Sequence, residues 1–156
     1  MDIFSPIISK VTKGMEGKTM LIYGTNGNGK TYQSARFKKP FYLPFESGLN
    51  GIGGVPLLRI QKWSDFKKIN KQLTNPNTLE KSKELYQTII FDGVESSAIM
   101  CQDYICNKYD AESIKSRNSG YGLWTEYESE FKRELNLLTS CGYTIVFISH
   151  ESERTF

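Results

Sequence analysis

The chain has 156 residues, of which 38% are hydrophobic and 24% are charged. These values fit one globular domain with a core of its own, and they exclude a wholly disordered chain. The formal net charge of +3 is mildly basic, so it permits contact with nucleic acid without demanding it. The sequence has neither a run of about 18 apolar residues nor a signal-peptide pattern, so we expect a cytoplasmic protein without membrane contact.

The elements predicted in chain order are strands that alternate with helices. After a weakly patterned lead-in over residues 1–17, short apolar runs predict strands at 19–23, 41–45, 56–60, 86–91 and 143–148. The segments between them predict helices at 30–37, 63–73, 94–109 and 124–138. Glycine-rich or polar stretches predict loops at 48–54, 74–83 and 110–122.

The most apolar of these strands are continuous rather than alternating, which is typical of strands buried on both faces of a parallel sheet. We therefore expect a single three-layer α/β domain over residues 1–156, with a mostly parallel central sheet of about five strands.

The cysteines, Cys101, Cys106 and Cys141, are odd in number and match neither a Cys-x-x-Cys pair nor a zinc pattern. Because His150 is the only histidine, a histidine metal cluster is excluded. We expect free thiols in a reducing compartment.

The segment from Gly24 to Thr31 matches the phosphate-loop pattern G-x-x-x-x-G-K-[ST] without a gap. A predicted strand precedes it and a predicted helix follows it, which is the context that this loop requires. Its glycines let backbone N–H groups approach phosphate oxygens, and the helix points its positive end at them. A glycine-rich turn without a ligand is the alternative, but motif and context together favour a site for ATP with Mg²⁺.

We expect one continuous set of residues to contact the nucleotide: Gly24, Thr25, Asn26, Gly27, Asn28, Gly29, Lys30, Thr31 and Tyr32. Lys30 would supply a charge to the β- and γ-phosphates, and the hydroxyl of Thr31 would be a ligand of Mg²⁺. Asp92 ends an apolar predicted strand and is the expected acidic partner of the metal. An aspartate that caps the following helix is the alternative interpretation.

Hydrolysis also needs a group that orients or deprotonates water. Many P-loop ATPases place a glutamate directly after the metal-binding aspartate, but this chain has Gly93 there. Glu95 lies at a helix start, where the helix dipole alone favours a carboxylate. Glu46 is the better candidate because it ends the second predicted strand, and ligands gather at the carboxyl ends of parallel strands. An exposed loop acid is the alternative.

His150 follows the last predicted strand by two residues, so it should lie at the same edge of the sheet. A polar side chain at that place can sense the γ-phosphate. An ordinary surface histidine is an equally open interpretation.

Together these motifs resemble the RecA-like ATPases, most closely the phage-encoded ATP-binding proteins of that group linked to single-strand annealing and recombination. The resemblance covers residues 18–156 in outline. In that family the phosphate loop is followed by a strand that ends in the catalytic glutamate, and Glu46 resembles that residue. Asp92 resembles the family's metal-binding acid, and His150 takes the sensor position. The family continues with a second DNA-binding loop and further strands beyond the point that corresponds to Phe156.

The resemblance implies that the protein hydrolyses ATP to ADP and phosphate with Lys30, Glu46 and His150 as catalytic residues. It also implies self-assembly into a homo-oligomer, single-stranded DNA as a partner, and a recombination or replication protein of phage or host as another. The location would be the cytoplasm of an infected or lysogenic cell. Arg154 is the only candidate for an arginine finger.

Contact with DNA is expected from the loop at 110–122, where Lys115, Arg117, Asn118 and Tyr121 combine positive charge, polar donors and an aromatic ring. A solvated loop is an equal alternative.

Two other functions stay open from the sequence. One is a module that uses nucleotide as a switch for binding a protein partner. The other is a small-molecule kinase, which would need several arginines over the phosphates. This second function is disfavoured because Arg59, Arg117 and Arg133 are scattered.

Overall fold

The computed structural model describes residues 13–46, 53–116 and 122–151. They form an α/β fold around a four-stranded sheet in which all pairings are parallel and the strand order is β1-β4-β3-β2. The strands are β1 (Thr19–Gly24), β2 (Pro40–Pro44), β3 (Thr88–Asp92) and β4 (Thr144–His150). The predicted α/β class and parallel sheet are confirmed, but the sheet has four strands rather than about five.

The missing strand is the one predicted at 56–60. This segment runs along the outer side of β2 but pairs with it only at a single bridge, between Tyr42 and Leu57. The N–H of Tyr42 donates to the carbonyl of Pro56 at 2.9 Å. The N–H groups of Leu58 and Ile60 donate to the carbonyls of Tyr42 and Pro44 at 3.2 Å and 3.1 Å. The bond between these two would need an N–H on Pro44, which proline lacks, so the ladder is interrupted there. The prediction of a full strand at this place is therefore wrong.

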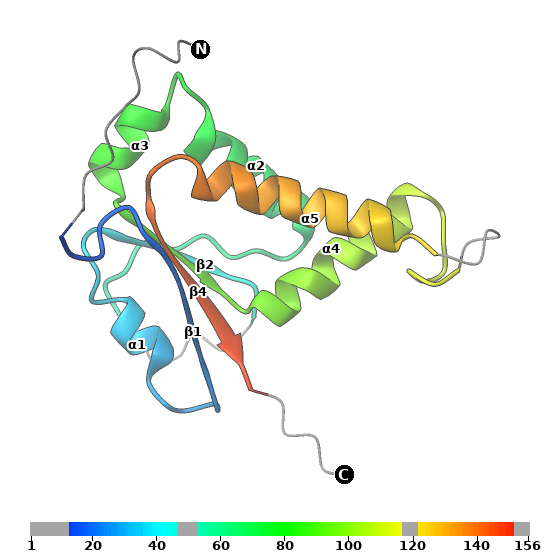
Figure 1. Ribbon diagram of the computed structural model, residues 1–156, viewed down its shortest axis with the longest axis horizontal. Coiled ribbons are helices and arrows are strands. Elements are labelled where there is room, and N and C mark those ends of the chain that lie inside the picture. The colour runs from blue at the N-terminus through cyan, green and yellow to red at the C-terminus, as the bar shows by residue number, and fades with distance from the viewer. Residues whose placement is uncertain (1–12, 47–52, 117–121, 152–156) are drawn as a thin grey trace, which may run out of the picture.

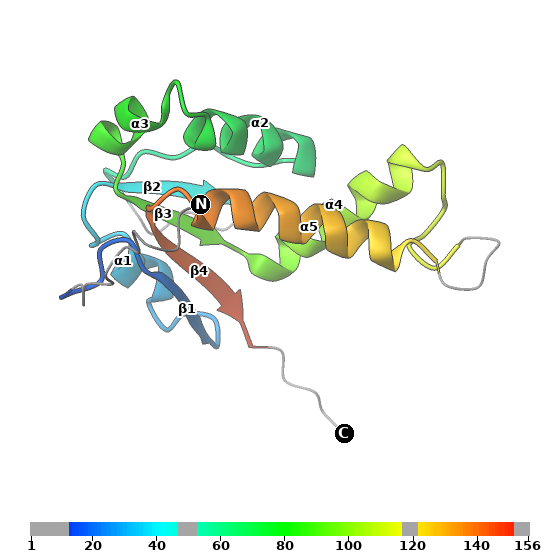
Figure 2. The ribbon, with the colours of Figure 1, turned by 45° about the horizontal axis from the view of Figure 1, so that its top comes forward.

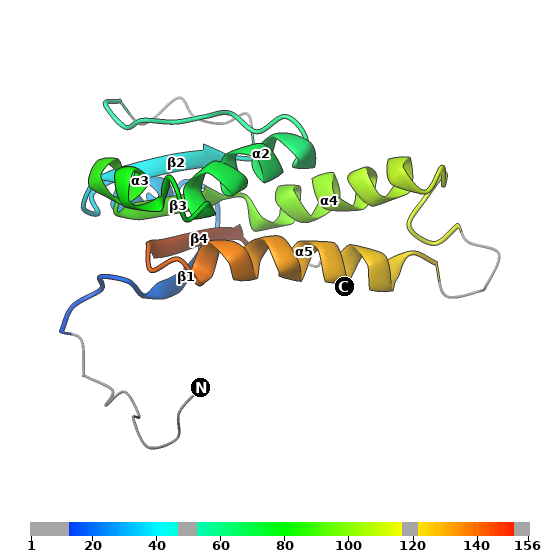
Figure 3. The same ribbon diagram turned by 90° about the horizontal axis from the view of Figure 1, so that it is seen from above.

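Helices cover both faces of the sheet (Figures 1 and 2). Helix α1 (Lys30–Ser34) lies on one face and is shorter than the predicted 30–37. The opposite face carries α2 (Trp63–Thr74), α4 (Val94–Lys108) and α5 (Trp124–Thr139). Figure 3 shows α4 and α5 side by side, extending together beyond the sheet. None of the helices in the described ranges is long and apolar enough to cross a bilayer.

Helix α3 (Leu79–Leu85) begins inside the stretch 74–83 that is predicted as a polar loop and extends past its end. The loop prediction is therefore wrong for residues 79–83. The helix buries none of its residues, and it connects α2 to β3. Because it has no apolar stripe, hydrophobic periodicity could not reveal it.

The core is divided by the sheet into two sides. The side facing α2, α4 and α5 holds the larger cluster, which includes Phe41, Leu43, Ile89, Phe91, Ile145, Trp63, Phe66 and Leu138. The side facing α1 holds Tyr42, Ile90, Val146 and Ile148. Alternate residues of β2, β3 and β4 therefore face two covered sides, which explains their continuous apolar sequence.

Strand β1 differs from the other three because it lies at an edge and pairs only with β4 among the described residues. Met20 and Ile22 pack against the smaller cluster, whereas Leu21 and Tyr23 are 59% and 73% exposed. The strand predicted at 19–23 is therefore covered on only one of its two faces.

Candidate functional site

The predicted site residues meet at the carboxyl edge of the sheet. Gly24, Asp92 and His150 end β1, β3 and β4, and Glu46 follows β2 by two residues. The register pairs Gly24 with His150 and Pro44 with Asp92. Since β4 lies between β1 and β3, His150 is placed between the phosphate loop and Asp92.

The loop from Gly24 to Thr31 closes around the ammonium group of Lys30. Lys30 Nζ donates to the carbonyl oxygens of Gly24 at 2.7 Å and Thr25 at 2.8 Å, and the lysine is buried. Gly29 has a φ of 70°, a left-handed conformation that favours glycine just before the helix. The loop thus combines a fixed positive charge with the backbone freedom that a phosphate cradle needs.

Asp92 connects this loop to the sheet. Its Oδ2 accepts a hydrogen bond from Thr31 Oγ1 at 3.0 Å and another from the hydroxyl of Tyr42. Its Oδ1 is buried and has no hydrogen-bond partner among the described residues. Burial raises the pKa of Asp92, although the hydrogen bond from Thr31 and the charges of His150 and Lys30 oppose this shift.

These features fit a bound Mg²⁺. An unpartnered carboxylate oxygen beside a threonine hydroxyl supplies the hard oxygen ligands that this ion prefers. In the part of the chain that the structure describes, no cluster of three or more His, Cys, Asp or Glu side chains could hold a metal alone. Thr31 and Asp92 would therefore share the ion with nucleotide phosphates and water.

Glu46 lies close to both Asp92 and His150. The N–H of Phe45 donates to the carbonyl of Asp92 at 2.9 Å, which holds the end of β2 against β3. Glu46 Oε1 accepts a hydrogen bond from Ser96 Oγ at 2.9 Å. His150 Nε2 lies 3.5 Å from Glu46 Oε2 and 3.9 Å from Asp92 Oδ1. The structure therefore brings together the three residues that the sequence placed at three separate strand ends.

Glu95, the less favoured acid, is engaged elsewhere. Ser149 Oγ donates to Glu95 Oε1, which ties the first turn of α4 to β4. Burial alone would raise the pKa of Glu95, but this bond and backbone hydrogen bonds outweigh it and lower the pKa. Its carboxylate is thus held as an ionised structural group.

Other predicted residues lie apart from this cluster. Tyr32 is 61% exposed on α1, with the guanidinium of Arg36 6.0 Å from its ring centroid. Lys115 is exposed beyond the far end of α4, a helix roughly 22 Å long that leads away from the sheet. The other predicted DNA contacts and the candidate arginine finger lie outside the described residues: Arg117, Asn118, Tyr121 and Arg154.

Three hydroxyl groups at the site belong to no motif: those of Tyr42, Ser96 and Ser149. Tyr42 lies two residues before Pro44, the partner of Asp92, so strand alternation places it on the same face. That spacing is the only sequence signal for it, and it requires knowledge of the register.

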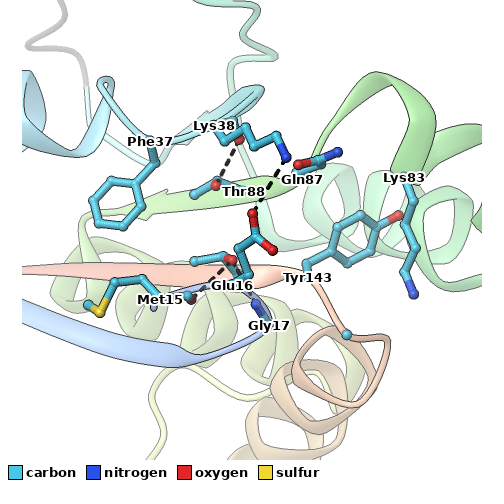
Figure 4. Close-up of a pocket in the computed structure, with 11 residues that line it drawn as sticks. Met15, Glu16, Gly17, Phe37, Lys38, Lys83, Gln87, Thr88 and Tyr143 are labelled. Carbon is cyan, nitrogen blue, oxygen red and sulfur yellow. Dashed lines mark hydrogen bonds and ion pairs between the residues drawn. The ribbon is translucent and has the colours of Figure 1, made fainter. Parts of the chain in front are cut away.

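A separate cavity of about 500 Å³ lies at the opposite, amino edge of the sheet (Figure 4). Met15, Phe37 and Tyr143 contribute its apolar walls, and Lys38 Nζ lies 3.5 Å from Glu16 Oε1. The residues that line it include none of the predicted site residues. The cavity is therefore distinct from the cluster around the phosphate loop.

Two comparisons with known proteins bear on this cluster. A model of the AAA domain family matches residues 16–156. The SPbeta prophage-derived uncharacterized protein YorG of Bacillus subtilis (strain 168) is 54% identical over 153 residues. The match covers 98% of this chain and 47% of that protein, so the chain spans about half the length of this relative.

Proposed function

This chain belongs to the AAA domain family, and from that premise we propose that it binds ATP with Mg²⁺ and hydrolyses it to ADP and phosphate. The observation that carries the proposal is the contact between the phosphate loop and the acidic strand end, made by Thr31 and Asp92. The residues proposed as phosphate cradle and as metal ligands lie with the carboxylate of Glu46 at one edge of the sheet, which supports the proposal.

In the proposed reaction, water attacks the γ-phosphate in line with the bond to ADP. Lys30 would exchange its bonds to loop carbonyls for bonds to phosphate oxygens, and thereby take up developing negative charge. Glu46 would orient the attacking water, and His150 would contact the γ-phosphate from its place between Glu46 and Asp92. Bound Mg²⁺, held by Thr31 and Asp92, would neutralise charge on the phosphates.

We extend the proposal to a RecA-like arrangement of a single domain. The strand that follows the phosphate-loop helix is β2, and Glu46 follows this strand by two residues, close to the place that the resemblance to RecA-like ATPases implies. The name of the relative, which describes it as prophage-derived, supports a phage setting. Single-stranded DNA, a homo-oligomer and a recombination partner belong to this extension, and the exposed Lys115 is the described residue that supports contact with DNA.

Phosphate release from ATP, measured with and without single-stranded DNA, tests the proposal. We expect Glu46→Gln to bind a fluorescent ATP analogue like the parent but to hydrolyse ATP roughly 100-fold more slowly. Lys30→Ala should lose binding itself, because its charge lies inside the loop. ATP binding by Lys30→Ala at parental affinity would overturn the phosphate cradle. Binding without hydrolysis by the parent would leave a nucleotide-switched module instead, and a lack of DNA stimulation would remove DNA from the proposal.

A further inference from the structure

Gly93, the residue directly after Asp92, leaves the space that Glu46 occupies. It caps α4 with a φ of 98°, and a Cβ placed on it would lie 2.9 Å from Glu46 Cγ and 3.0 Å from Glu46 Oε1. Real side-chain contacts of this kind are essentially never so short. The side chain of Glu46 therefore lies directly on the backbone of Gly93, and this position cannot carry a side chain of its own without displacing it.

Contact with a glycine backbone limits where the carboxyl group of Glu46 lies, but it does not set how the group is turned. The terminal torsion of a glutamate is broad and roughly two-fold, so either oxygen can face a given neighbour. Ser96, in the first turn of α4, donates to Oε1 at 2.9 Å. The other oxygen, Oε2, lies on the side of His150, with Nε2 at 3.5 Å.

We propose that Ser96 is a positioning residue for the hydrolysis proposed above, on which this inference rests. By holding Oε1, the hydroxyl of Ser96 turns Oε2 of Glu46 toward the space beside His150 and Asp92. Oε2 is then the oxygen that accepts a hydrogen bond from the attacking water. Ser96 itself touches neither the water nor the nucleotide.

Two features separate this role from a general effect on the site. Ser96 is neutral, so its loss leaves the charges that attract the nucleotide unchanged. Its hydroxyl contacts Glu46 rather than the phosphate loop, so the affinity for ATP should not depend on it. An interaction that matters only for the orientation of the attacking group lowers kcat and leaves KM nearly unchanged.

The test compares Ser96→Ala and Ser96→Thr with the matched control Ser97→Ala. Ser97 lies in the same turn of α4, but its hydroxyl donates to the carbonyl of Val94 at 2.6 Å. We expect Ser96→Ala to lower kcat for ATP hydrolysis about 10-fold with an unchanged KM. Ser96→Thr, which keeps the hydroxyl, should stay near the parent, and so should Ser97→Ala. Thermal unfolding of all three variants should match the parent.

A double-mutant cycle with Glu46→Gln then asks whether Ser96 acts through Glu46. We expect Ser96→Ala to lower the residual rate of Glu46→Gln by less than about 2-fold, because the two residues form one unit. A parental kcat in Ser96→Ala, or an equal loss in both backgrounds, would overturn this inference and leave the proposed ATPase intact. A parent that hydrolyses no ATP would overturn the proposed function, and this inference with it.

Discussion

The substitution Asp92→Asn tests what the buried charge of Asp92 contributes to the stability of the fold and to the binding of Mg²⁺ and ATP. The side chain is only 12% exposed. Oδ2 accepts hydrogen bonds from Thr31 and Tyr42, whereas Oδ1 has no partner in the described ranges. Asparagine keeps an acceptor in the place of Oδ2 and removes the negative charge. We therefore expect a more stable fold that binds Mg²⁺ and ATP less well.

The expected gain follows from the charge, because burial disfavours the ionised carboxylate more than the hydrogen bond from Thr31 and the nearby positive charges favour it. The unpartnered position of Oδ1 would pass to the amide NH2 of asparagine, so the gain comes from removing the charge alone. Its removal should raise the free energy of unfolding by about 1–2 kcal/mol at pH 7. For a domain of this size the melting temperature would rise by roughly 3–6 °C. The affinity for ATP with Mg²⁺ should fall roughly 10-fold or more, because the proposed metal ligand is lost.

The effect on stability should depend on pH in one direction. Burial raises the pKa of Asp92 in the folded state above the value of about 3.9 expected for an unfolded chain. The protonated group favours folding below the unfolded pKa, and this contribution is lost as the pH rises through the folded pKa. The advantage of Asp92→Asn over the parent should therefore be largest at neutral pH and vanish below about pH 4.

Thermal unfolding followed by circular dichroism between pH 4 and pH 8 measures both effects. Asp103→Asn, on the exposed side of α4, is the matched control and should unfold like the parent at every pH. A variant Asp92→Asn that is less stable than the parent at pH 7 would refute the reasoning. An advantage that does not change with pH would refute it equally.

Two further substitutions test other parts of the structure. Gly93→Ala should destabilise the fold by about 1–3 kcal/mol, because of the φ of 98° at Gly93 and its contact with Glu46. It should also lower the rate of ATP hydrolysis more than the affinity for ATP. A parental melting temperature would contradict this prediction. Glu130→Gln breaks a pair with Lys67 at 2.8 Å on a side chain only 4% exposed, and should cost about 1–3 kcal/mol at pH 7 in thermal unfolding. Burial alone would raise the pKa of Glu130, but hydrogen bonds from Lys67 and Trp63 lower it. The ionised carboxylate of Glu130 therefore stabilises the fold above the unfolded pKa of about 4.3, and this stabilisation is lost as the pH falls through the folded pKa. A variant as strongly destabilised at pH 3 as at pH 7 would contradict this role of the charge.

The carboxyl edge could be predicted from the sequence because parallel strands have only one such edge. Gly24, Asp92 and His150 lie at or near the ends of apolar runs in the sequence. In a parallel sheet the carboxyl ends of all strands lie at the same edge, so these three residues are expected to lie close together. Two of the errors in the fold have local causes. Helix α3 has no apolar stripe, and the ladder at 56–60 is broken by the missing N–H of Pro44.

The finer features of the site depend on register and side-chain direction, which no motif encodes. The hydroxyls of Tyr42 and Ser96 reach their carboxylates from β2 and α4, across about 50 residues of sequence in each case. Gly93 illustrates the same limit. In the sequence, Gly93 stands where many P-loop ATPases have a glutamate. In the structure, its lack of a side chain leaves room for the side chain of Glu46.

The edge position of β1 has a consequence for how the domain folds. This strand carries the phosphate loop, yet among residues 13–46, 53–116 and 122–151 it pairs only with β4, and its first residue, Thr19, pairs with Ile145. Such long-range closure is slow and comes after local contacts. We therefore expect the loop that would hold the nucleotide to become ordered late, when β1 pairs with β4. Any ligand bound to both Gly24 and His150 would hold β1 and β4 together. Its binding would therefore raise the free energy needed to separate these two strands in a local unfolding event.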